Sequence, residues 1–237
     1  MPVSFDNTQT AFSSQSGSDL RRSYWLFRLV SSPAFVNVGK HLTNLALTLH
    51  LPIKWVIKPT IFKHFCGGET VEESRKKMNE LAKAGIKSIL DYSAEGKETE
   101  KDFDHCTNEM ISIIQEASRN KNIGFAVFKP TGIARFALLE KVSAITPRDK
   151  GQGTGDGGNS HLSNILTEIE KREFDRVYER FNRICKAAYE AGVPIFVDAE
   201  ESWRQRAVDE IVNDMMKSYN KEKPIVYNTF QMYRKDR

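Results

Sequence analysis

Three side chains with the means to do chemistry each lie at the end of an apolar run. Lys129, Asp198 and Gln231 come directly after stretches whose composition is typical of buried β-strands. In βα barrels and in doubly wound sheets, ligands meet the carboxyl ends of the strands. The three residues are therefore the first candidates for a binding or catalytic site.

Lys129 offers a cation at the edge of a partly buried pocket. An ammonium group in such a place needs a carboxylate partner, which a substrate or a neighbouring strand can supply. Asp198 is the candidate partner within the chain, and a paired lysine can still meet an anionic ligand. The spacing favours the functional and the structural interpretation equally.

Asp198 stands with Glu200 and Glu201 in an acidic corner. Such a corner can bind a divalent metal, orient a substrate amine, or cap the next helix, and capping is the commonest use. The amide of Gln231 suits hydrogen bonds to a planar heterocycle, and it equally suits a neighbouring backbone group. Residue types alone leave these alternatives open.

Other motifs give less. The five histidines show no HxH or HExxH spacing, so we predict no metal site. A GxSxG elbow is absent from the sequence, which argues against a serine hydrolase. The glycines from Gly151 to Gly158 resemble a phosphate-binding loop only weakly, because they neither follow a strand directly nor end in GK[ST]. A flexible surface insertion is favoured there.

Four strand-like runs alternate with helical stretches after Gly85, a pattern typical of parallel βαβ construction. Each run is largely apolar, as expected for strands that are covered on both faces. The expected strands are Ile86–Tyr92, Ile123–Phe128, Pro194–Val197 and Ile225–Phe230. The expected linking helices are Glu100–Lys121, Phe174–Ala191 and Trp203–Tyr219.

The segment before the first strand predicts a different organisation. Residues 1–19 are rich in polar side chains and are expected to form a disordered tail. Residues 20–84 are expected to form a helical arm, in which Thr70 and Glu73 predict a capping box for a helix that ends near Gly85. Residues 85–237 then form the βα region.

Composition sets the remaining limits. The 237 residues, 40% of them hydrophobic, suffice for an ordinary core, and the net charge of +4 is spread along the chain. We therefore predict no nucleic-acid partner. Three widely spaced cysteines indicate a reducing, intracellular setting. We expect neither a secretory signal nor a transmembrane span.

Three segments taken together resemble the proline dehydrogenase family. They are Phe128–Phe136, Phe196–Trp203 and Val226–Tyr233, which occur in the family's order, each at a predicted strand end. The similarity runs from about Leu20 to Arg237. It implies an α/β fold of the parallel (βα)₈ TIM-barrel type, with about the first four βα units present here after the helical arm.

The resemblance also implies an activity. Family members bind FAD, oxidise L-proline to Δ1-pyrroline-5-carboxylate in proline catabolism, and pass the electrons to a quinone. Carried over by position, Lys129 contacts the proline carboxylate, Asp198 is a polar anchor in the same pocket, and Gln231 binds the flavin ring. A cation suits the carboxylate, and a donor near the flavin stabilises the charge of its reduced form.

The family's remaining strands and a late arginine pair have no counterpart before Arg237. We therefore expect a truncated reading frame or a fragment, and the alternative to an enzyme is a non-catalytic half barrel that a separate chain completes. Self-association of two halves is a further expectation. The expected location is the cytoplasm, or the mitochondrion of a eukaryote. Peripheral contact with the inner membrane stays open, because the apolar residues of the arm suit packing as well as anchoring.

Overall fold

A computed structural model describes residues 6–92, 96–146 and 166–235 of the protein. The chain divides into two compact units, Met1–Ile86 and Lys87–Arg237. The glycine-rich stretch from Gly151 to Gly158 lies outside the described residues.

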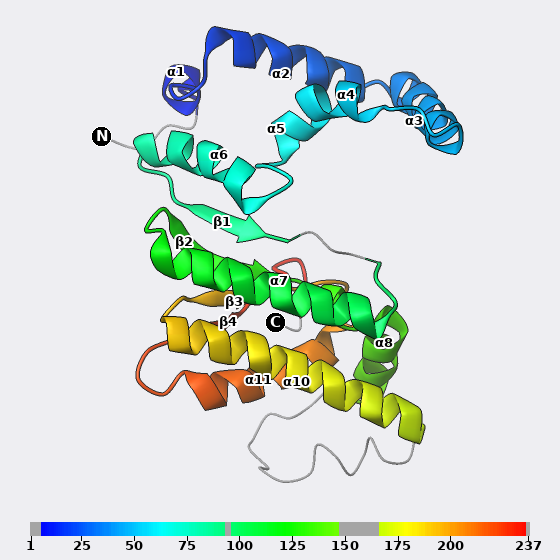
Figure 1. The fold of residues 1–237 in the computed structure, drawn as a ribbon, viewed down its shortest axis with the longest axis vertical. Coiled ribbons are helices and arrows are strands. Elements are labelled where there is room, and N and C mark those ends of the chain that lie inside the picture. The colour runs from blue at the N-terminus through cyan, green and yellow to red at the C-terminus, as the bar shows by residue number, and fades with distance from the viewer. Residues whose placement is uncertain (1–5, 93–95, 147–165, 236–237) are drawn as a thin grey trace. The chain divides into compact units, whose positions relative to one another are not determined.

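Every described element of the first unit is helical (Figure 1). The elements are α1 (Thr8–Ala11), α2 (Gly17–Val30), α3 (Pro33–Thr48), α4 (Lys54–Ile57), the π-helix η1 (Lys58–Phe62), α5 (Lys63–Phe65) and α6 (Val71–Lys83). Local signals begin several of them. Ser16 caps α2, and Pro33 occupies the first turn of α3, where its missing N–H costs nothing.

Residues 1–19 were expected to be a disordered tail, yet two helices begin there. The Asn7 side chain accepts a hydrogen bond from the backbone N–H of Thr10 and so caps the four-residue helix α1. The first turn of α2 also lies before residue 20. The division into tail, arm and half barrel stays a prediction.

Helix α6 forms half of its expected capping box. The Thr70 hydroxyl accepts the N–H of Glu73 at 3.2 Å, as predicted. The Glu73 carboxylate binds the N–H of Glu69 at 3.1 Å instead of the N–H of Thr70. The chain leaves the helix through Gly85, whose φ of +75° is the left-handed conformation that favours glycine.

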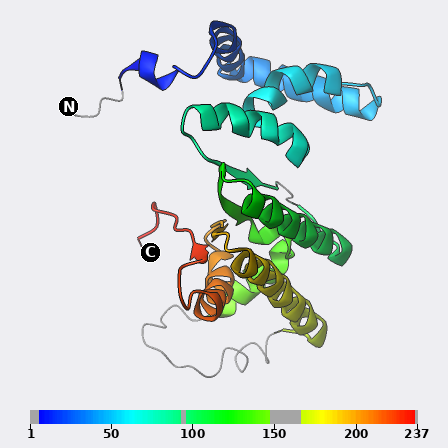
Figure 2. The same ribbon diagram turned by 60° about the vertical axis from the view of Figure 1, so that its left-hand side comes forward.

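The second unit is a parallel sheet with its strands in chain order, β1-β2-β3-β4 (Figure 2). The strands are β1 (Ser88–Asp91), β2 (Ile123–Phe128), β3 (Ile195–Val197) and β4 (Val226–Asn228). The helical elements are α7 (Glu100–Arg119), the 3₁₀ turn η2 (Pro130–Gly132), α8 (Phe136–Ile145), α10 (Glu168–Ala191) and α11 (Gln205–Tyr219). This is the expected α/β arrangement of the barrel type, and all four predicted strands are confirmed.

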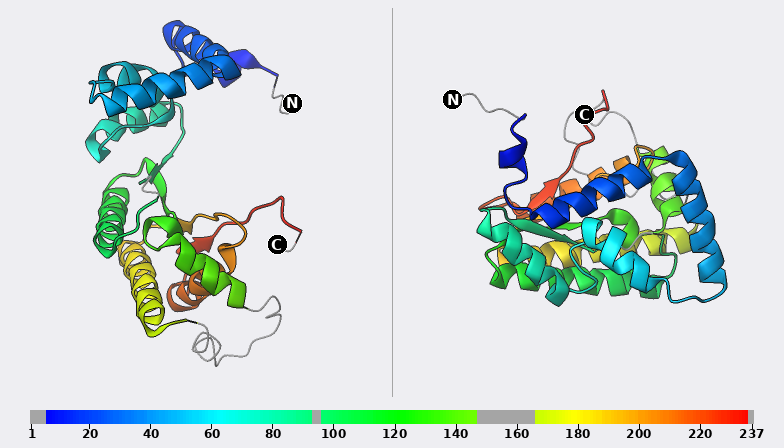
Figure 3. Two further views of the ribbon diagram at one scale, coloured as in Figure 1. Left: turned by 90° about the vertical axis from the view of Figure 1, so that its right-hand side faces the viewer. Right: turned by 90° about the horizontal axis from the view of Figure 1, so that it is seen from above.

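The core of the second unit lies between the sheet and its helices, where α7 and α10 run side by side (Figure 3). Phe128 at the end of β2 contacts Phe181 of α10, with 5.2 Å between the ring centroids. Both side chains are almost fully buried. Burial of such aromatic side chains is the main favourable contribution to folding, and here it fixes the strand that carries Lys129.

Helix α10 begins six residues before its expected start. The hydroxyl of Thr167 accepts the N–H of Glu170, and the Glu170 carboxylate accepts the N–H of Thr167. This complete capping box satisfies two free donors of the first turn. The helix ends at Gly192, which has a φ of +65°.

Candidate active site at the strand ends

The sheet register brings Lys129 and Asp198 to the same level. Phe128 pairs with Val197, and the N–H of Asp198 donates to the carbonyl of Phe128 at 3.0 Å. Each candidate residue therefore comes directly after a paired strand position. The backbones of Lys129 and Asp198 therefore lie next to each other, at the end of the sheet formed by the carboxyl ends of its strands.

An aromatic cluster occupies the face of the sheet opposite to the helices. Phe125 and Phe196 stack with 4.4 Å between their ring centroids, and Tyr227 meets Phe196 at 5.5 Å. Side chains alternate along a strand, so Lys129 and Asp198 continue the positions of this face. Lys129 and Asp198 thus come next to the aromatic cluster, on the face of the sheet that the helices do not cover.

Glu200 joins the segments that follow β2 and β3. Its carboxylate accepts the backbone N–H of Thr131 at 2.9 Å and also the hydroxyl of Thr131. Thr131 is almost fully buried in the turn η2, two residues after Lys129. The carboxylate therefore fixes the turn that carries Lys129.

Gln231 also contacts Glu200. Its amide nitrogen donates to the backbone carbonyl of Glu200. Its amide oxygen, Oε1, is buried and accepts no hydrogen bond from the described residues. A buried acceptor without a donor is unusual in folded proteins, so this atom is a candidate contact for a bound ligand.

A polar chain extends from Glu200 to β4. The N–H of Glu200 donates to Oε1 of Gln205 at 3.0 Å, and the Gln205 amide donates to Asp209 at 3.0 Å. Asn228 at the end of β4 donates to the same carboxylate at 2.8 Å. Gln205 is 1% exposed, so its amide is committed to this structural network.

The acidic corner does not cap helix α11, although capping was the commonest use expected for it. Glu201 instead pairs with Arg204 at 2.5 Å. The cap comes from α8, where Oγ of Ser143 accepts the N–H of Ala207 at 3.0 Å. Ser143 lies 64 residues before Ala207, so no local pattern in the sequence indicates this contact.

Burial dominates the electrostatics of Glu200. Removal from water raises the pKa of its carboxyl group, while the hydrogen bonds from Thr131 and the charge of Lys129 oppose that rise. An ion pair between Lys129 and Asp198, the structural alternative for Lys129, stays a prediction.

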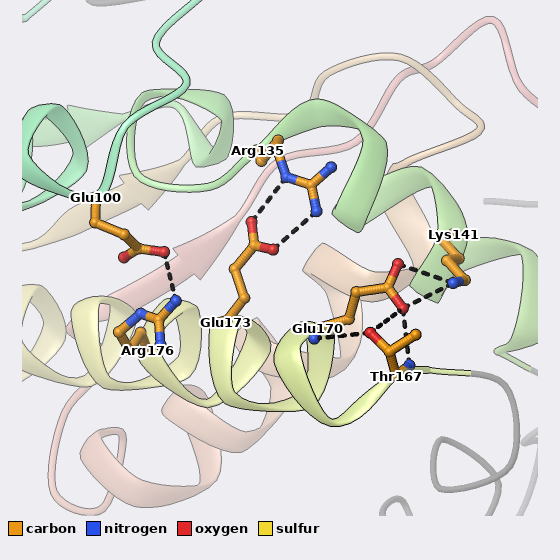
Figure 4. A network of polar contacts seen from close by, with 7 residues as sticks. All are labelled: Glu100, Arg135, Lys141, Thr167, Glu170, Glu173 and Arg176. Carbon is orange, nitrogen blue, oxygen red and sulfur yellow. Dashed lines mark hydrogen bonds and ion pairs between the residues drawn. The ribbon is translucent and has the colours of Figure 1, made fainter.

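Ion pairs connect α10 to the segment after β2 and to α7 (Figure 4). Arg135 makes a bidentate contact with Glu173, at 2.9 and 2.8 Å, and Lys141 of α8 binds Glu170 at 2.8 Å. Arg176 binds Glu100 at 2.7 Å. Sequence reasoning missed these residues, because their partners lie 29 to 76 residues apart.

Comparison with known sequences decides the family. The sequence model described as proline dehydrogenase matches residues 74–237, more than half of the chain. The chain belongs to the proline dehydrogenase family. Mitochondrial proline dehydrogenase 1 of Dictyostelium discoideum is 29% identical over an alignment that covers 96% of this chain and 43% of that protein.

Two further similarities support the assignment of family and fold. The carbapenem antibiotics biosynthesis protein CarD of Pectobacterium carotovorum is 31% identical, with 73% of this chain and 41% of that protein covered. The crystal structure of proline utilization A from Bdellovibrio bacteriovorus, inactivated by N-propargylglycine, has a TM-score of 0.55. That match covers 95% of this chain and 21% of the other, at 13% identity, and it shows the fold.

The chain spans about half the length of the curated relatives it matches, between 41% and 53% in the first five. Several of these relatives, from Dictyostelium, fission yeast and Arabidopsis, are described as mitochondrial. Among the described residues, no helix combines the length and the apolar character needed to cross a bilayer.

Proposed function

We propose that this chain forms the flavin and proline site of a proline dehydrogenase, which uses FAD to oxidise L-proline to Δ1-pyrroline-5-carboxylate and passes the electrons to a quinone. The observation that carries the proposal is that Lys129, Asp198 and Gln231 follow three neighbouring parallel strands, β2, β3 and β4, in a chain of this family. The buried, partnerless Oε1 of Gln231 fits a flavin, because the ring system offers an N–H donor.

Bound flavin would supply the hydride acceptor, and the protein supplies binding and orientation. Lys129 would bind the proline carboxylate, since an ammonium beside an apolar floor attracts an anion strongly. Gln231 would bind the flavin through its free amide oxygen. The aromatic rings of Phe125 and Phe196 stack on the face of the sheet whose positions Lys129 continues, and they would provide the apolar wall that such sites commonly have.

Asp198 would act on the substrate nitrogen. Hydride removal requires a neutral proline amine, and a nearby carboxylate changes how readily that amine loses its proton. Turnover of Asp198→Asn across pH tests this role. A shifted pH profile is expected, and an unchanged profile would remove the role.

The visible spectrum of the purified chain with FAD, before and after anaerobic addition of L-proline, tests the whole proposal. Bound flavin that bleaches with proline is the expected result. Lys129→Met should raise the proline concentration needed for half-bleaching by about tenfold or more, because the carboxylate loses a charge-assisted hydrogen bond. Lys121→Met, at an exposed lysine just before β2, is the matched control. Equal effects of the two variants would contradict the assignment.

Flavin binding can be tested apart from turnover. Gln231→Ala should weaken the binding of FAD, measured by quenching of flavin fluorescence, by about fivefold or more. Gln115→Ala, at an exposed glutamine of α7, should change nothing. Retention of full affinity in Gln231→Ala would show that the free amide oxygen has another use.

A second candidate function is a half barrel that another chain completes. In the described sheet, β1 and β4 each pair on one side only, and Ile89 of β1 is 49% exposed. An open strand edge is a template for pairing with another chain. Light scattering during size-exclusion chromatography tests self-association. A monomer that binds FAD and oxidises proline would dismiss this candidate.

We also propose that the first unit makes a peripheral contact with an anionic membrane surface. Residues 20–68 contain seven Lys and Arg residues and no Asp or Glu. Large apolar side chains are exposed on the same stretch, Trp55 at 85% and Phe35 at 62% among them. An apolar cavity of about 360 Å³ lies between α3 and α4 and is lined by Leu42, Leu45 and Val56. Exposed aromatic and basic residues together favour an anionic interface.

Co-flotation with phosphatidylglycerol vesicles tests this contact, with phosphatidylcholine vesicles as the comparison. Trp55→Ala should reduce the bound fraction, whereas Trp203→Ala in the second unit, 54% exposed, should leave it unchanged. Equal recovery with both lipids, or with neither, would contradict the proposal.

A further inference from the structure

Glu200 is the one residue at the strand ends whose three polar groups each bind a different described segment. Its carboxylate binds Thr131 after β2, its N–H binds Gln205 at the start of α11, and its carbonyl receives the amide of Gln231 after β4. The segments lie 69, 5 and 31 residues away along the chain. Through its side chain and its backbone, Glu200 thus connects the segments that follow β2, β3 and β4.

The connection to Thr131 passes directly to Lys129. Gly132 donates to the carbonyl of Lys129 at 3.0 Å, which closes the η2 turn around the buried Pro130 and Thr131. The backbone bond from Asp198 to Phe128 holds the end of β2 to β3, and the two hydrogen bonds from Thr131 to the Glu200 carboxylate extend this attachment to the turn. Without them, the turn would keep its local shape but lose its side-chain attachment to the segment after β3.

We propose that Glu200 is a positioning residue, which sets the placement of Lys129 and Gln231 through the reach of its side chain rather than through its charge. Both carboxyl oxygens of Glu200 accept from Thr131, one from the N–H at 2.9 Å and the other from the hydroxyl, so the contact requires the full length of the side chain. This inference rests on the proposed function for its catalytic meaning, and its structural test does not.

Two conservative changes separate the length of the Glu200 side chain from its charge. Glu200→Gln keeps the length: its carbonyl oxygen can accept the N–H of Thr131, and its amide can donate to the Thr131 hydroxyl, which rotates to accept. Glu200→Asp keeps the charge but withdraws the carboxylate by one methylene group. Reach predicts that the Gln variant retains the contact and the Asp variant loses it. Charge predicts the reverse.

The experiment is amide hydrogen exchange on the purified full chain without ligand, read at Thr131. Glu200→Asp should speed exchange about tenfold, which is the effect of losing a buried hydrogen bond. Glu200→Gln should stay within about threefold of the wild type. Glu201→Asp and Glu201→Gln are the matched controls, because Glu201 binds only Arg204 among the described residues. Both controls should leave Thr131 unchanged.

A second pair of variants approaches the contact from its other end. Thr131→Ser keeps both hydrogen-bond donors, so its amides should exchange at the wild-type rate. Thr131→Val loses the hydroxyl, so the amide hydrogens that follow residue 131 should exchange about threefold to fivefold faster. This pair decides the question if Glu200→Asp does not fold. Faster exchange in Glu200→Gln equal to that in Glu200→Asp would overturn the role of reach. No change in any variant would overturn the positioning role itself.

Steady-state kinetics with FAD and proline then link the contact to the site. Glu200→Asp should raise KM for proline with a smaller effect on kcat, because Lys129 loses its placement, and Glu200→Gln should restore KM. If proline does not bleach the flavin bound to the wild-type chain, the proposed function is contradicted. The exchange result at Thr131 would still stand or fall by itself.

Discussion

The two units of this chain differ in what holds their helices. In the first unit, Met78 is the only buried side chain among the described residues, and the caps at α2 and α6 come from the neighbouring Ser16 and Thr70. In the second unit, the Oγ of Ser143 in α8 caps α11 by accepting the N–H of Ala207, and buried side chains of β2, β3 and β4 form a core with the helices. The first unit thus has few described contacts that bury side chains, whereas helices of the second unit are held by contacts between distant segments as well as by local caps.

The largest expected contrast comes from removing one aromatic side chain in each unit. Phe181 of α10 is fully buried, so Phe181→Ala should lower the free energy of unfolding by about 3–5 kcal/mol. Trp55→Ala removes a side chain that is 85% exposed, and the expected change is within about 0.5 kcal/mol. Urea titrations followed by far-UV circular dichroism measure both.

The Trp55 variant tests whether the exposed side chains of the first unit are also exposed in solution. A loss of more than about 1 kcal/mol in Trp55→Ala would mean that another surface covers this side chain in solution. Self-association would be the first explanation to check, by repeating the titration at several protein concentrations. A stability that is independent of concentration would leave the exposed face of the first unit as described.

Ion pairs provide the next contrast. Arg180 is almost fully buried, binds Glu100 and Asp104 of α7, and lies 5.4 Å from the ring of Phe103. Arg180→Met should lower the stability of the second unit by about 2 kcal/mol, because the buried guanidinium also donates to the carbonyl of Ile133. The half-exposed partners can find water, which keeps the loss below that of a fully buried pair.

Lys58 is the matched cation of the first unit. It binds Glu69 at 2.7 Å and Glu73 at 3.0 Å, and all three side chains are well exposed. Exposed ion pairs contribute little to stability, so Lys58→Met should shift the urea midpoint hardly at all. If Lys58→Met shifts the urea midpoint as much as Arg180→Met does, the exposed ion pairs of Lys58 contribute as much to stability as the buried ones of Arg180, and the contrast is wrong.

The same contrast explains what could be predicted from the sequence. The four strands were placed within about two residues of their ends, because apolar runs between polar helices are a local signal. The start of α10 was placed too late, since the apolar pattern from Phe174 was used and the capping box at Thr167 and Glu170 was missed. That signal was present in the sequence and is of the same kind as the one recognised at Thr70.

The candidate site could be predicted only in part. Lys129, Asp198 and Gln231 were identified from their positions after strands and from family resemblance, and their roles stay proposals. The part played by Glu200 could not be predicted, because its partner Thr131 lies 69 residues earlier. Nothing local distinguishes a glutamate that binds a distant turn from one that caps the next helix. Only the register of β2 against β3 brings the two residues together.

The smallest expected effect is the dependence of stability on acid. Hydrogen bonds from Arg176 and Arg180 lower the pKa of Glu100 to about 2, well below the ordinary value of 4.5. A carboxyl group with a lowered pKa in the folded state stabilises the protein above its unfolded pKa, and that contribution disappears as the pH falls from about 4.5 through about 2. Burial raises the pKa of Glu200, so protonation of that group acts in the opposite direction.

Urea titrations at about pH 7, 4 and 2.5 on the wild type and on Glu100→Gln isolate this contribution. The variant should be less stable near neutral pH by about 1 kcal/mol or less, since Glu100 is 41% exposed and solvent screens the pair. The two proteins should converge as the pH falls towards 2, because the wild-type carboxylate is then protonated as well. Glu140→Gln, at an exposed glutamate of α8, should follow the wild type throughout. A gap between wild type and Glu100→Gln that persists in acid would mean that shape, rather than charge, makes Glu100 favourable at the junction of α7 and α10.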